Sequence, residues 1–385
     1  MTRRRASLFP FLLGTYSLVS IGLFLFSYTQ VDLSLTLSQV SIFQMIEKIF
    51  QHIGFYQRPV ATSWFIGLLI VYFALYAIAL IAVKRKLIST KQLWTIIIVL
   101  SVLTIFSYPA FSYDIYNYMF TAKTVLVYHK NPYMVIPLQF TGVEPWLSFM
   151  RWTHLPSAYT PLWIFISLPA YILGFGYFLL ILENFKLLAL GFYLLTIWFI
   201  AKILDILDVD KRDLGVAIFA LNPLVIFETL VSAHNDIEMM AFAMMSLFFY
   251  ITKKRILAYL FLALSVGAKL MTLFLYPVIV FGYRRIFALI AMCVGLILVL
   301  FQREVLAWYF IWIMPFIALL PDNEVSIIVA FGVSLGLLLR YAPYFYYGDW
   351  NKPVPTIELW VTLIPIGLSM ILYATQRMIR HKPLF

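Results

Sequence analysis

Long apolar segments alternate with short basic clusters along almost the whole chain. The first three apolar segments are Leu8–Tyr28, Ala61–Val83 and Leu93–Ala110, and the clusters Arg3–Arg5 and Lys84–Lys86 border them. An apolar run of about 20 residues can cross the hydrocarbon core of a bilayer as a helix. Because backbone groups must find partners inside the chain at that depth, such runs fold as helices. The pattern predicts an all-α, polytopic transmembrane protein.

The basic clusters indicate which loops face the cytoplasm, because such loops are rich in Lys and Arg. The clusters are Arg3–Arg5, Lys84–Lys91, Lys211–Arg212, Lys253–Arg255, Arg284–Arg285 and Arg377–Lys382. Counting crossings between them predicts about twelve, with the N- and C-termini both cytoplasmic. The isolated Arg340 does not fit this assignment.

Three segments are expected not to cross the membrane as simple spans. Val40–Phe55 has the pattern of an amphipathic helix that lies on the membrane surface. For the number of crossings to agree with the sides assigned to the basic clusters, 159–173 must begin and end outside, as a re-entrant or interfacial helix. Between Arg255 and Arg284 the chain is too short for two full spans. Ile256–Phe281 is therefore predicted to be a short hairpin with Lys269 at its turn.

Composition excludes a soluble globular protein. Hydrophobic residues make up 63% of the chain and charged residues only 12%, against about a quarter in soluble domains. The net charge of +11 comes from the loop clusters, so it does not indicate nucleic-acid binding. Cys293 is the only cysteine, which rules out an intramolecular disulfide. The whole chain, 1–385, is predicted to be one transmembrane domain in the plasma membrane.

One polar, aromatic-rich stretch, Ser112–Tyr133, opens the predicted extracytoplasmic loop 111–157. If its start is helical, one face carries Asp114, Asn117, Tyr118 and Thr121 and the other carries Ile115, Met119, Ala122 and Leu126. This indicates a helix on the membrane surface whose carboxylate points away from lipid. The alternative is an amphipathic connector that Asp114 caps.

Most of the unexpected polar residues fall on the same predicted outer side. They are Asp114, Asn117, His129, Lys130, Glu144, Arg151, His154, His234, Asn235, Asp236, Arg303 and Glu304. The chain contains no HExxH, GxSxG or glycine-rich phosphate motif. An outer site has no access to cytoplasmic nucleotide sugars, so an activated donor must arrive on a lipid.

Lys269 is expected to point from the hairpin turn into a polar cavity. A lysine near the bilayer centre costs about 2.5–3.5 kcal/mol on insertion scales, so it needs an anionic partner. The phosphate of a lipid donor is the partner that the sequence predicts. One alternative is a lysine that extends to the membrane interface. The other is a structural ion pair of Lys269 with Asp236 or Glu238.

Three motifs together resemble GT-C glycosyltransferases, most closely the polyprenol-phosphate-mannose-dependent mannosyltransferases. The first is Ser112–Tyr133 followed by Trp152–Trp163, WTHLPSAYTPLW. The second is Leu221–Leu224 leading into Ala233–Asp236, then Lys269 in its hairpin. The third is Ala307–Tyr309 with Trp312 and Pro315. The resemblance spans about 93–320.

The resemblance implies a role for each matching residue. Asp114 would be the general base that takes a proton from the acceptor hydroxyl. The donor phosphate would be bound by Lys269, with Arg303 and His234 behind it. The expected sugar- and acceptor-binding residues are Asn117, Tyr118, Tyr133, His154, Tyr159, Asn235, Asp236, Trp308 and Tyr309. For the aromatic residues, packing and interface anchoring are alternative roles.

The resemblance leaves several points open. Asp114 is followed by Ile115-Tyr116, whereas the more distantly similar GPI-type mannosyltransferases show Asp-x-Asp at this place. The metal dependence of the chain is therefore open. No cofactor is assigned, and a divalent cation remains an option. The expected partners are the bilayer, a polyprenyl-phosphate sugar donor and a glycan or lipid acceptor of the cell envelope. The resemblance implies that the donor sugar is mannose.

Two other function classes compete with the enzyme. A transporter or flippase of the polyprenyl-phosphate sugar would use the outer polar cluster as a vestibule, but the chain shows no internal repeat of the kind found in transporters. A non-catalytic assembly subunit would leave Asp114 dispensable.

Overall fold

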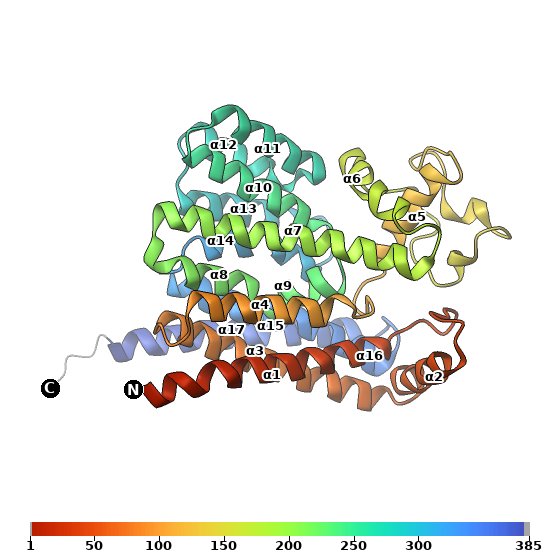
Figure 1. Ribbon diagram of the computed structural model, residues 1–385, viewed down its shortest axis with the longest axis horizontal. Helices are drawn as coiled ribbons and strands as arrows, with labels where there is room; N and C mark the ends of the chain where they lie inside the picture. The colour runs from red at the N-terminus through yellow and green to blue at the C-terminus, as the bar shows by residue number, and fades with distance from the viewer. Residues whose placement is uncertain (1, 381–385) are drawn as a thin grey trace.

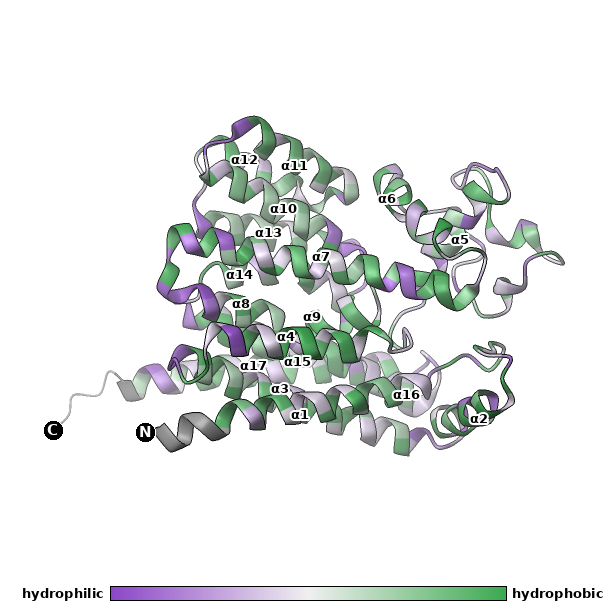
Figure 2. Ribbon diagram, viewed as in Figure 1, coloured by the Kyte–Doolittle hydropathy of each residue, from purple (hydrophilic) through white to green (hydrophobic). Residues whose placement is uncertain are grey.

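The computed structural model describes residues 2–380, with side chains for residues 8–378. Within this range every regular element is a helix, and the longest helices lie side by side along one direction (Figure 1). Lys382, which the sequence analysis placed in the last basic cluster, lies outside the described residues. The ribbon coloured by hydropathy shows mainly hydrophobic residues along the helices and hydrophilic ones concentrated at helix ends and turns (Figure 2). The all-α prediction is confirmed.

Five helical stretches in the described part of the chain are long and apolar enough to cross a membrane. Three of them are Leu8–Tyr28 of α1 (Thr2–Tyr28), α3 (Arg58–Lys84) and α7 (Phe178–Leu207). The fourth, Glu324–Tyr347, joins α15 (Glu324–Leu339) to α16 (Tyr341–Tyr347), and the fifth is Val354–Met378 of α17 (Val354–Arg380). A sixth is Val209–Ala220 with Pro223–Val231, which bend by 57° at their junction. Twelve crossings and cytoplasmic termini remain predictions.

The remaining apolar helices of the bundle are shorter. They are α4 (Thr90–Ile105), α6 (Pro161–Ile172), α8 (Arg212–Ala220), α9 (Pro223–Ile226), α10 (Asp236–Ile251), α11 (Arg255–Ala268), α12 (Leu275–Val280), α13 (Arg285–Leu300) and α14 (Met314–Ala318), with the short helices η3 (Val209–Lys211), η4 (Phe227–Val231), η5 (Leu270–Phe274) and η6 (Ala307–Trp312). Several of them end inside the bundle, which opens polar turns among packed helices.

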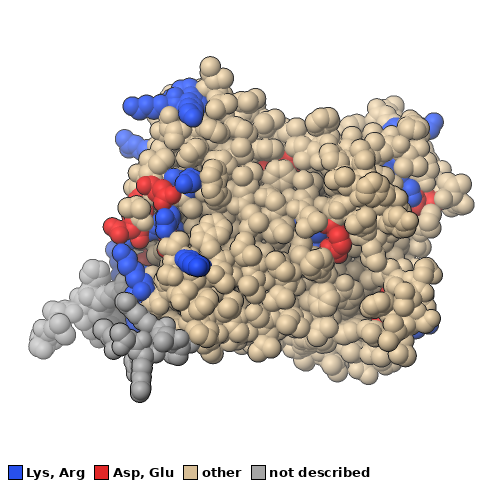
Figure 3. Space-filling view, viewed as in Figure 1, with Lys and Arg blue, Asp and Glu red and all other residues tan. Residues whose placement is uncertain are grey.

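The basic loops lie together at one end of the bundle, where α3, α7 and α17 finish (Figures 1 and 3). Lys84 pairs with Glu324 at 2.9 Å and Lys86 with Asp210 at 3.2 Å. Lys211 also forms an ion pair with Asp322. Loops that the sequence analysis assigned to one side of the membrane therefore share one end of the molecule.

The predicted hairpin around Lys269 is present. Helix α11 ends at Ala268 and η5 begins at Leu270, so Lys269 alone forms the break, with an extended backbone at φ −161° and ψ 132°. The Ser265 hydroxyl donates to the Met239 carbonyl at 2.7 Å and lies 2.8 Å from the Thr272 hydroxyl. These bonds hold the hairpin against α10 and fix the position of its turn.

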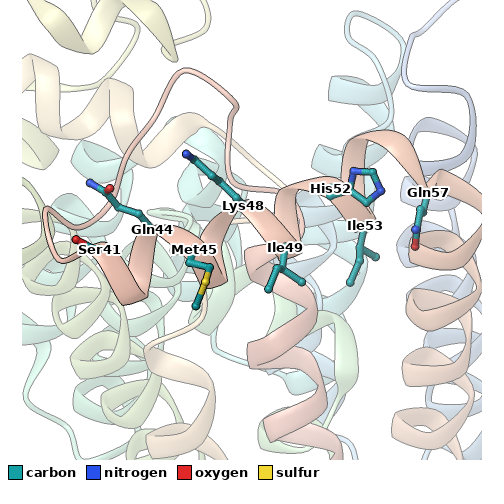
Figure 4. A pocket seen from close by; sticks show the side chains of 8 residues that line it. All are labelled: Ser41, Gln44, Met45, Lys48, Ile49, His52, Ile53 and Gln57. Atoms are coloured by element: carbon teal, nitrogen blue, oxygen red, sulfur yellow. The ribbon is translucent and has the colours of Figure 1, made fainter.

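Helix α2 (Ser41–Tyr56) confirms the predicted helix at 40–55. Its buried polar residues face the protein: the Glu47 carboxylate accepts the Leu37 N–H at 3.1 Å, and Gln51 donates to the Asp32 carbonyl at 3.1 Å. Met45 and Ile49 are exposed and point to one side of the helix, away from Lys48 (Figure 4). A depression of about 560 Å³ runs along α2, lined by Ser41, Gln44, Met45, Lys48, Ile49, His52, Ile53 and Gln57.

Helix α5 (Asp114–Leu126) forms as predicted but does not lie on a surface. Ile115 and Met119 on one face are fully buried, and so, within a few per cent, is Tyr118 on the other. The Tyr116 ring packs 5.1 Å from Phe149 of the following loop, measured between ring centroids. The expectation of a surface-lying helix is wrong because the loop, α6 and α7 cover the polar face as well.

The loop between α5 and α6 is held by Glu144. Its carboxylate pairs with Lys123 at 2.7 Å, accepts the Tyr128 hydroxyl at 2.8 Å and accepts the Trp146 N–H at 3.0 Å. The Lys123 ammonium also lies 4.1 Å from the Trp146 ring centroid. The loop also contains the helical turns η1 (Pro137–Phe140) and η2 (Pro145–Ser148). Glu144 therefore organises the loop and does not belong to the outer polar site.

The orientation of the bundle can be tested by cysteine labelling in a Cys293→Ser background. We expect a membrane-impermeant maleimide to label Val143→Cys, an exposed loop position, in intact cells. Lys254→Cys, also exposed, should react only after permeabilisation, because its basic cluster is predicted to be cytoplasmic. Labelling of Lys254→Cys in intact cells would contradict the predicted sidedness.

The packing of α2 can be tested through Gly54. A Cβ added there would lie 1.7 Å from the Thr29 carbonyl oxygen, whereas one added at Gly67 of α3 meets nothing within 4 Å. Gly54→Ala should therefore lower the free energy of unfolding by about 1–3 kcal/mol, the usual cost of overpacking. Gly67→Ala is the matched control in thermal unfolding of the detergent-solubilised protein. Equal melting temperatures would show that α2 does not dock on Thr29.

Candidate active site

Asp114 is the first residue of α5 and points toward His234. Its backbone N–H is accepted by the Ser112 hydroxyl at 3.2 Å, and the residue before it, Tyr113, makes no side-chain capping bond. One carboxylate oxygen, Oδ2, lies 3.7 Å from His234 Nδ1, and the Asp114 side chain is 22% exposed. The carboxylate thus faces a second functional group, which a purely capping role would not require.

His234 is completely buried at the turn between η4 and α10. Its Nε2 lies 3.3 Å from Glu228 Oε2, and its backbone N–H donates to the Glu228 carbonyl at 3.0 Å. The Trp308 ring stacks on the imidazole, with centroids 4.0 Å apart and planes inclined by 20°. The imidazole therefore presents its two nitrogens to two carboxylates while its face is covered.

Lys269 and Asp236 form an ion pair beside this histidine. Lys269 Nζ lies 2.7 Å from Asp236 Oδ1, and the Trp312 indole N–H donates to the same oxygen. The Asp236 side chain is fully buried and that of Lys269 is one-third exposed. From the sequence, an ion pair with Asp236 or Glu238 was the alternative to a lipid phosphate as the partner of Lys269. In the structure Asp236 pairs with Lys269, because the N-terminus of α10 packs against the hairpin turn.

Asn235 is bound to α5 through Tyr118. The Tyr118 hydroxyl lies 3.3 Å from the Asn235 side-chain oxygen and accepts the Asn235 backbone N–H at 3.5 Å. The Tyr118 ring is held edge-on by Tyr159 at 4.6 Å and Trp163 at 5.1 Å between centroids. Tyr133 is joined to the same cluster, because its hydroxyl donates to the Tyr159 carbonyl at 2.6 Å.

On the opposite side of the site, η6 supplies aromatic rings. Tyr309 stacks on Trp312 with centroids 4.5 Å apart, and the exposed Arg303 side chain lies beside the Tyr309 hydroxyl. Asn117 is buried on α5, and its side-chain nitrogen has no hydrogen-bond partner among the described residues. These groups border the cluster formed by Asp114, His234, Asp236 and Lys269.

His154 is not part of this cluster. It is exposed in the loop, and its recorded contact is with the Trp152 ring, 6.5 Å between centroids. Arg151 pairs with Asp32 at 3.5 Å and so ties the loop to the α1–α2 connection. The predicted role of His154 at the site therefore has no support from its position, because none of its contacts reaches Asp114.

The charge state of Asp114 depends on its neighbours. Burial raises the pKa of the Asp114 carboxyl, while the positive charges of His234 and Lys269 oppose this shift and Asp236 reinforces it; the net result is a raised pKa. A carboxylate with a raised pKa is a stronger base once ionised, which suits proton abstraction near neutral pH.

The sequence analysis missed Glu228. Its side chain is fully buried, and Oε1 accepts the Tyr341 hydroxyl at 2.8 Å. The available signal was a carboxylate within the apolar segment Leu214–Val231, since an ionisable residue inside a predicted span indicates a functional site by default. Trp312 appeared only as part of a motif, and its contact with Asp236 was not predicted.

No group of three or more His, Cys, Asp or Glu side chains among residues 2–380 is arranged to hold a metal ion. The site consists of the carboxyl groups of Asp114, Asp236 and Glu228, the His234 imidazole and the Lys269 ammonium, surrounded by aromatic rings. Such a set can accept a proton and neutralise a developing negative charge.

Comparison with known proteins identifies the family. The model described as alpha-(1->6)-mannopyranosyltransferase, N-terminal domain, matches residues 14–285. The match includes Asp114, Glu228, His234 and Lys269 and covers well over half of the chain. No curated protein and no solved structure matches it. The chain therefore belongs to the MptA_B family of alpha-(1->6)-mannopyranosyltransferases, and the GT-C mannosyltransferase resemblance seen in its sequence is confirmed.

Proposed function

We propose that this membrane mannosyltransferase takes mannose from a polyprenyl-phosphate donor and transfers it to a glycan or lipid acceptor on the extracytoplasmic face of the plasma membrane. The observation that carries the proposal is the placement of the partly exposed Asp114 and Lys269 in one cluster around the buried His234 and Asp236. One group can accept a proton and the other can bind a leaving phosphate. The family match gives no support to a transporter or flippase.

In the proposed reaction, an acceptor hydroxyl attacks the anomeric carbon of the donor mannose. A new C–O bond forms, the bond to the phosphate oxygen breaks, and the hydroxyl proton passes to the Asp114 carboxylate. The polyprenyl phosphate leaves with an added negative charge. The family description, alpha-(1->6), suggests the 6-hydroxyl of a mannose residue as the nucleophile.

Lys269 is the proposed site for the leaving phosphate. An ammonium has three N–H donors, and the bond to Asp236 uses one of them. The side chain is one-third exposed at the hairpin turn, so the remaining donors can meet a phosphate that enters from the bilayer. Arg303 at the border of the site adds a second positive charge. We assign no cofactor.

Two subsites are proposed for the sugars. Trp308 and Tyr309 on η6 offer ring faces and edges on the Lys269 side, where the donor mannose would lie. Asn117, Tyr118, Tyr159 and Asn235 border Asp114 from the α5 side, where the acceptor would lie. Because Asn235 and Tyr118 already contact each other, they present a preformed hydrogen-bonding edge.

The role of Asp114 can be tested with Asp114→Asn. The amide keeps the shape of the carboxylate but cannot accept the proton, so turnover should fall by about 10²–10⁴-fold. The measurement is transfer of radiolabelled mannose from polyprenyl-phosphate mannose in membranes. Asp349→Asn, an exposed carboxylate after α16, is the matched control. Near-normal turnover by Asp114→Asn would refute the assignment.

The role of Lys269 can be tested with Lys269→Met. The donor KM should rise and kcat should fall, and the protein should also lose stability, because Asp236 is left buried and unpaired. The loss should be less than the about 3–5 kcal/mol typical of a fully buried pair, since Lys269 is partly exposed.

A double variant separates the two effects. Lys269→Met with Asp236→Asn should recover thermal stability without recovering donor affinity. If donor KM and kcat return with stability, the pair is only structural.

A further inference from the structure

Three acidic and basic side chains form a line that ends in Asp114. Glu228 Oε2 lies 3.3 Å from His234 Nε2, and His234 Nδ1 lies 3.7 Å from Asp114 Oδ2. The other oxygen of Glu228 accepts the Tyr341 hydroxyl at 2.8 Å. The imidazole thus separates two carboxylates, and both Glu228 and His234 have no exposed side-chain surface.

The backbone that carries this line is irregular. Glu228 lies in η4, a π-helical turn, and π-helical turns occur frequently at functional sites. Ala233, directly before the histidine, has a φ of +56°, a left-handed conformation that costs free energy for a residue with a Cβ. The bond from the His234 N–H to the Glu228 carbonyl closes this turn.

Hydrogen bonds also hold the break between α8 and α9, at Asn222. The Asn222 side chain accepts the Leu224 N–H at 2.9 Å and donates to the Ser334 hydroxyl at 3.1 Å. At His234 itself, the stacked Trp308 ring and the backbone bond to Glu228 leave the imidazole little freedom to turn its nitrogens away from the carboxylates. Such preorganisation of a buried polar group is the arrangement that a catalytic site requires.

We propose that Glu228 is a positioning residue which, held by Tyr341, orients His234 and favours a proton on its imidazole, so that His234 keeps Asp114 ionised. The inference rests on the proposed role of Asp114 as the base. Glu228 does not touch the reacting atoms, because it lies on the far side of the imidazole from Asp114.

The electrostatic balance at Asp114 supports this role. Burial raises the pKa of the Asp114 carboxyl, and the positive charge of His234 is the largest contribution that opposes burial, followed by Lys269. The negative Asp236 acts in the opposite direction. The hydroxyls of Tyr118, Tyr159, Tyr309 and Tyr341 also lie within electrostatic reach of Asp114. A positive charge on the imidazole is therefore the largest of the contributions that favour the ionised Asp114 carboxylate.

The sign of the expected pH effect follows from this balance. A general base acts when ionised, so turnover is lost as the pH falls through the pKa of Asp114. Glu228→Gln removes the charge that favours the imidazolium but keeps the size of the side chain. Asp114 then loses its positive neighbour, its pKa rises further, and the acidic limb of the pH profile moves to higher pH.

The kinetic test is the pH dependence of kcat/KM for mannose transfer by Glu228→Gln. We expect the acidic limb to shift upward by about one pH unit, the scale on which a nearby charge acts, with turnover approaching wild type above the limb. Glu238→Gln, which also removes a fully buried carboxyl, is the matched control and should not shift the limb. An unshifted limb with turnover reduced equally at every pH would assign Glu228 a structural role and overturn the proposal.

A second measurement does not depend on turnover. The chain has five histidines, so the ¹⁵N signal of His234 can be assigned in nanodiscs by its loss in His234→Gln. We expect an imidazolium signal at pH 7 in the wild type and a neutral imidazole in Glu228→Gln. A neutral wild-type His234 at pH 7 would overturn the inference even if Glu228→Gln does not fold. Full activity of Asp114→Asn would instead refute the proposed base and leave this spectroscopic result intact.

Discussion

The cost of an unpaired polar group in an apolar bundle decides which side chains gather around Asp114. In hydrocarbon or in a packed core, a charge must meet an opposite charge or a hydrogen-bond partner. Asp236 meets Lys269 at 2.7 Å, and Glu228 meets the Tyr341 hydroxyl at 2.8 Å. The Lys186 ammonium, fully buried in α7, donates to the Ser107 carbonyl, which is freed where α4 ends. Each charge therefore joins segments that are distant in the sequence, and the site is the place where several of these links meet.

Aromatic packing also connects the segments that carry the site. The Phe111 ring, three residues before Asp114, packs 5.2 Å from Phe227, which opens the π-helical turn of Glu228, and 6.0 Å from Phe345 of α16. Phe65 of α3 packs 5.1 Å from Phe345. This cluster sets the distance between α5, η4 and α16. The line from Tyr341 to Asp114 depends on that spacing, because each of its residues comes from a different element.

Features set by local pattern were predictable from the sequence, and those set by long-range packing were not. The break at Lys269 followed from the spacing of basic clusters, and the helices at 41–56 and 114–126 followed from their periodicity. The sequence named Asp236 only as one alternative partner of Lys269, because the pair forms only when α10 packs on α11. The burial of α5 on both faces was missed for a similar reason. Amphipathicity shows which face is polar, but it does not show that a loop folded around Glu144 covers that face.

The breaks in the shorter helices have a common physical reason. An unbroken span satisfies all its backbone groups internally and has none to offer a polar substrate. The chain is irregular at Ala233, which precedes His234, and at Lys269, which pairs with Asp236, so both breaks adjoin the cluster. Irregular backbone at membrane depth is tolerated only where protein or a polar cavity surrounds it. The two breaks therefore belong together: they place His234 and Lys269 beside the Glu228 and Asp236 carboxylates, so each break brings a polar side chain to a charged partner.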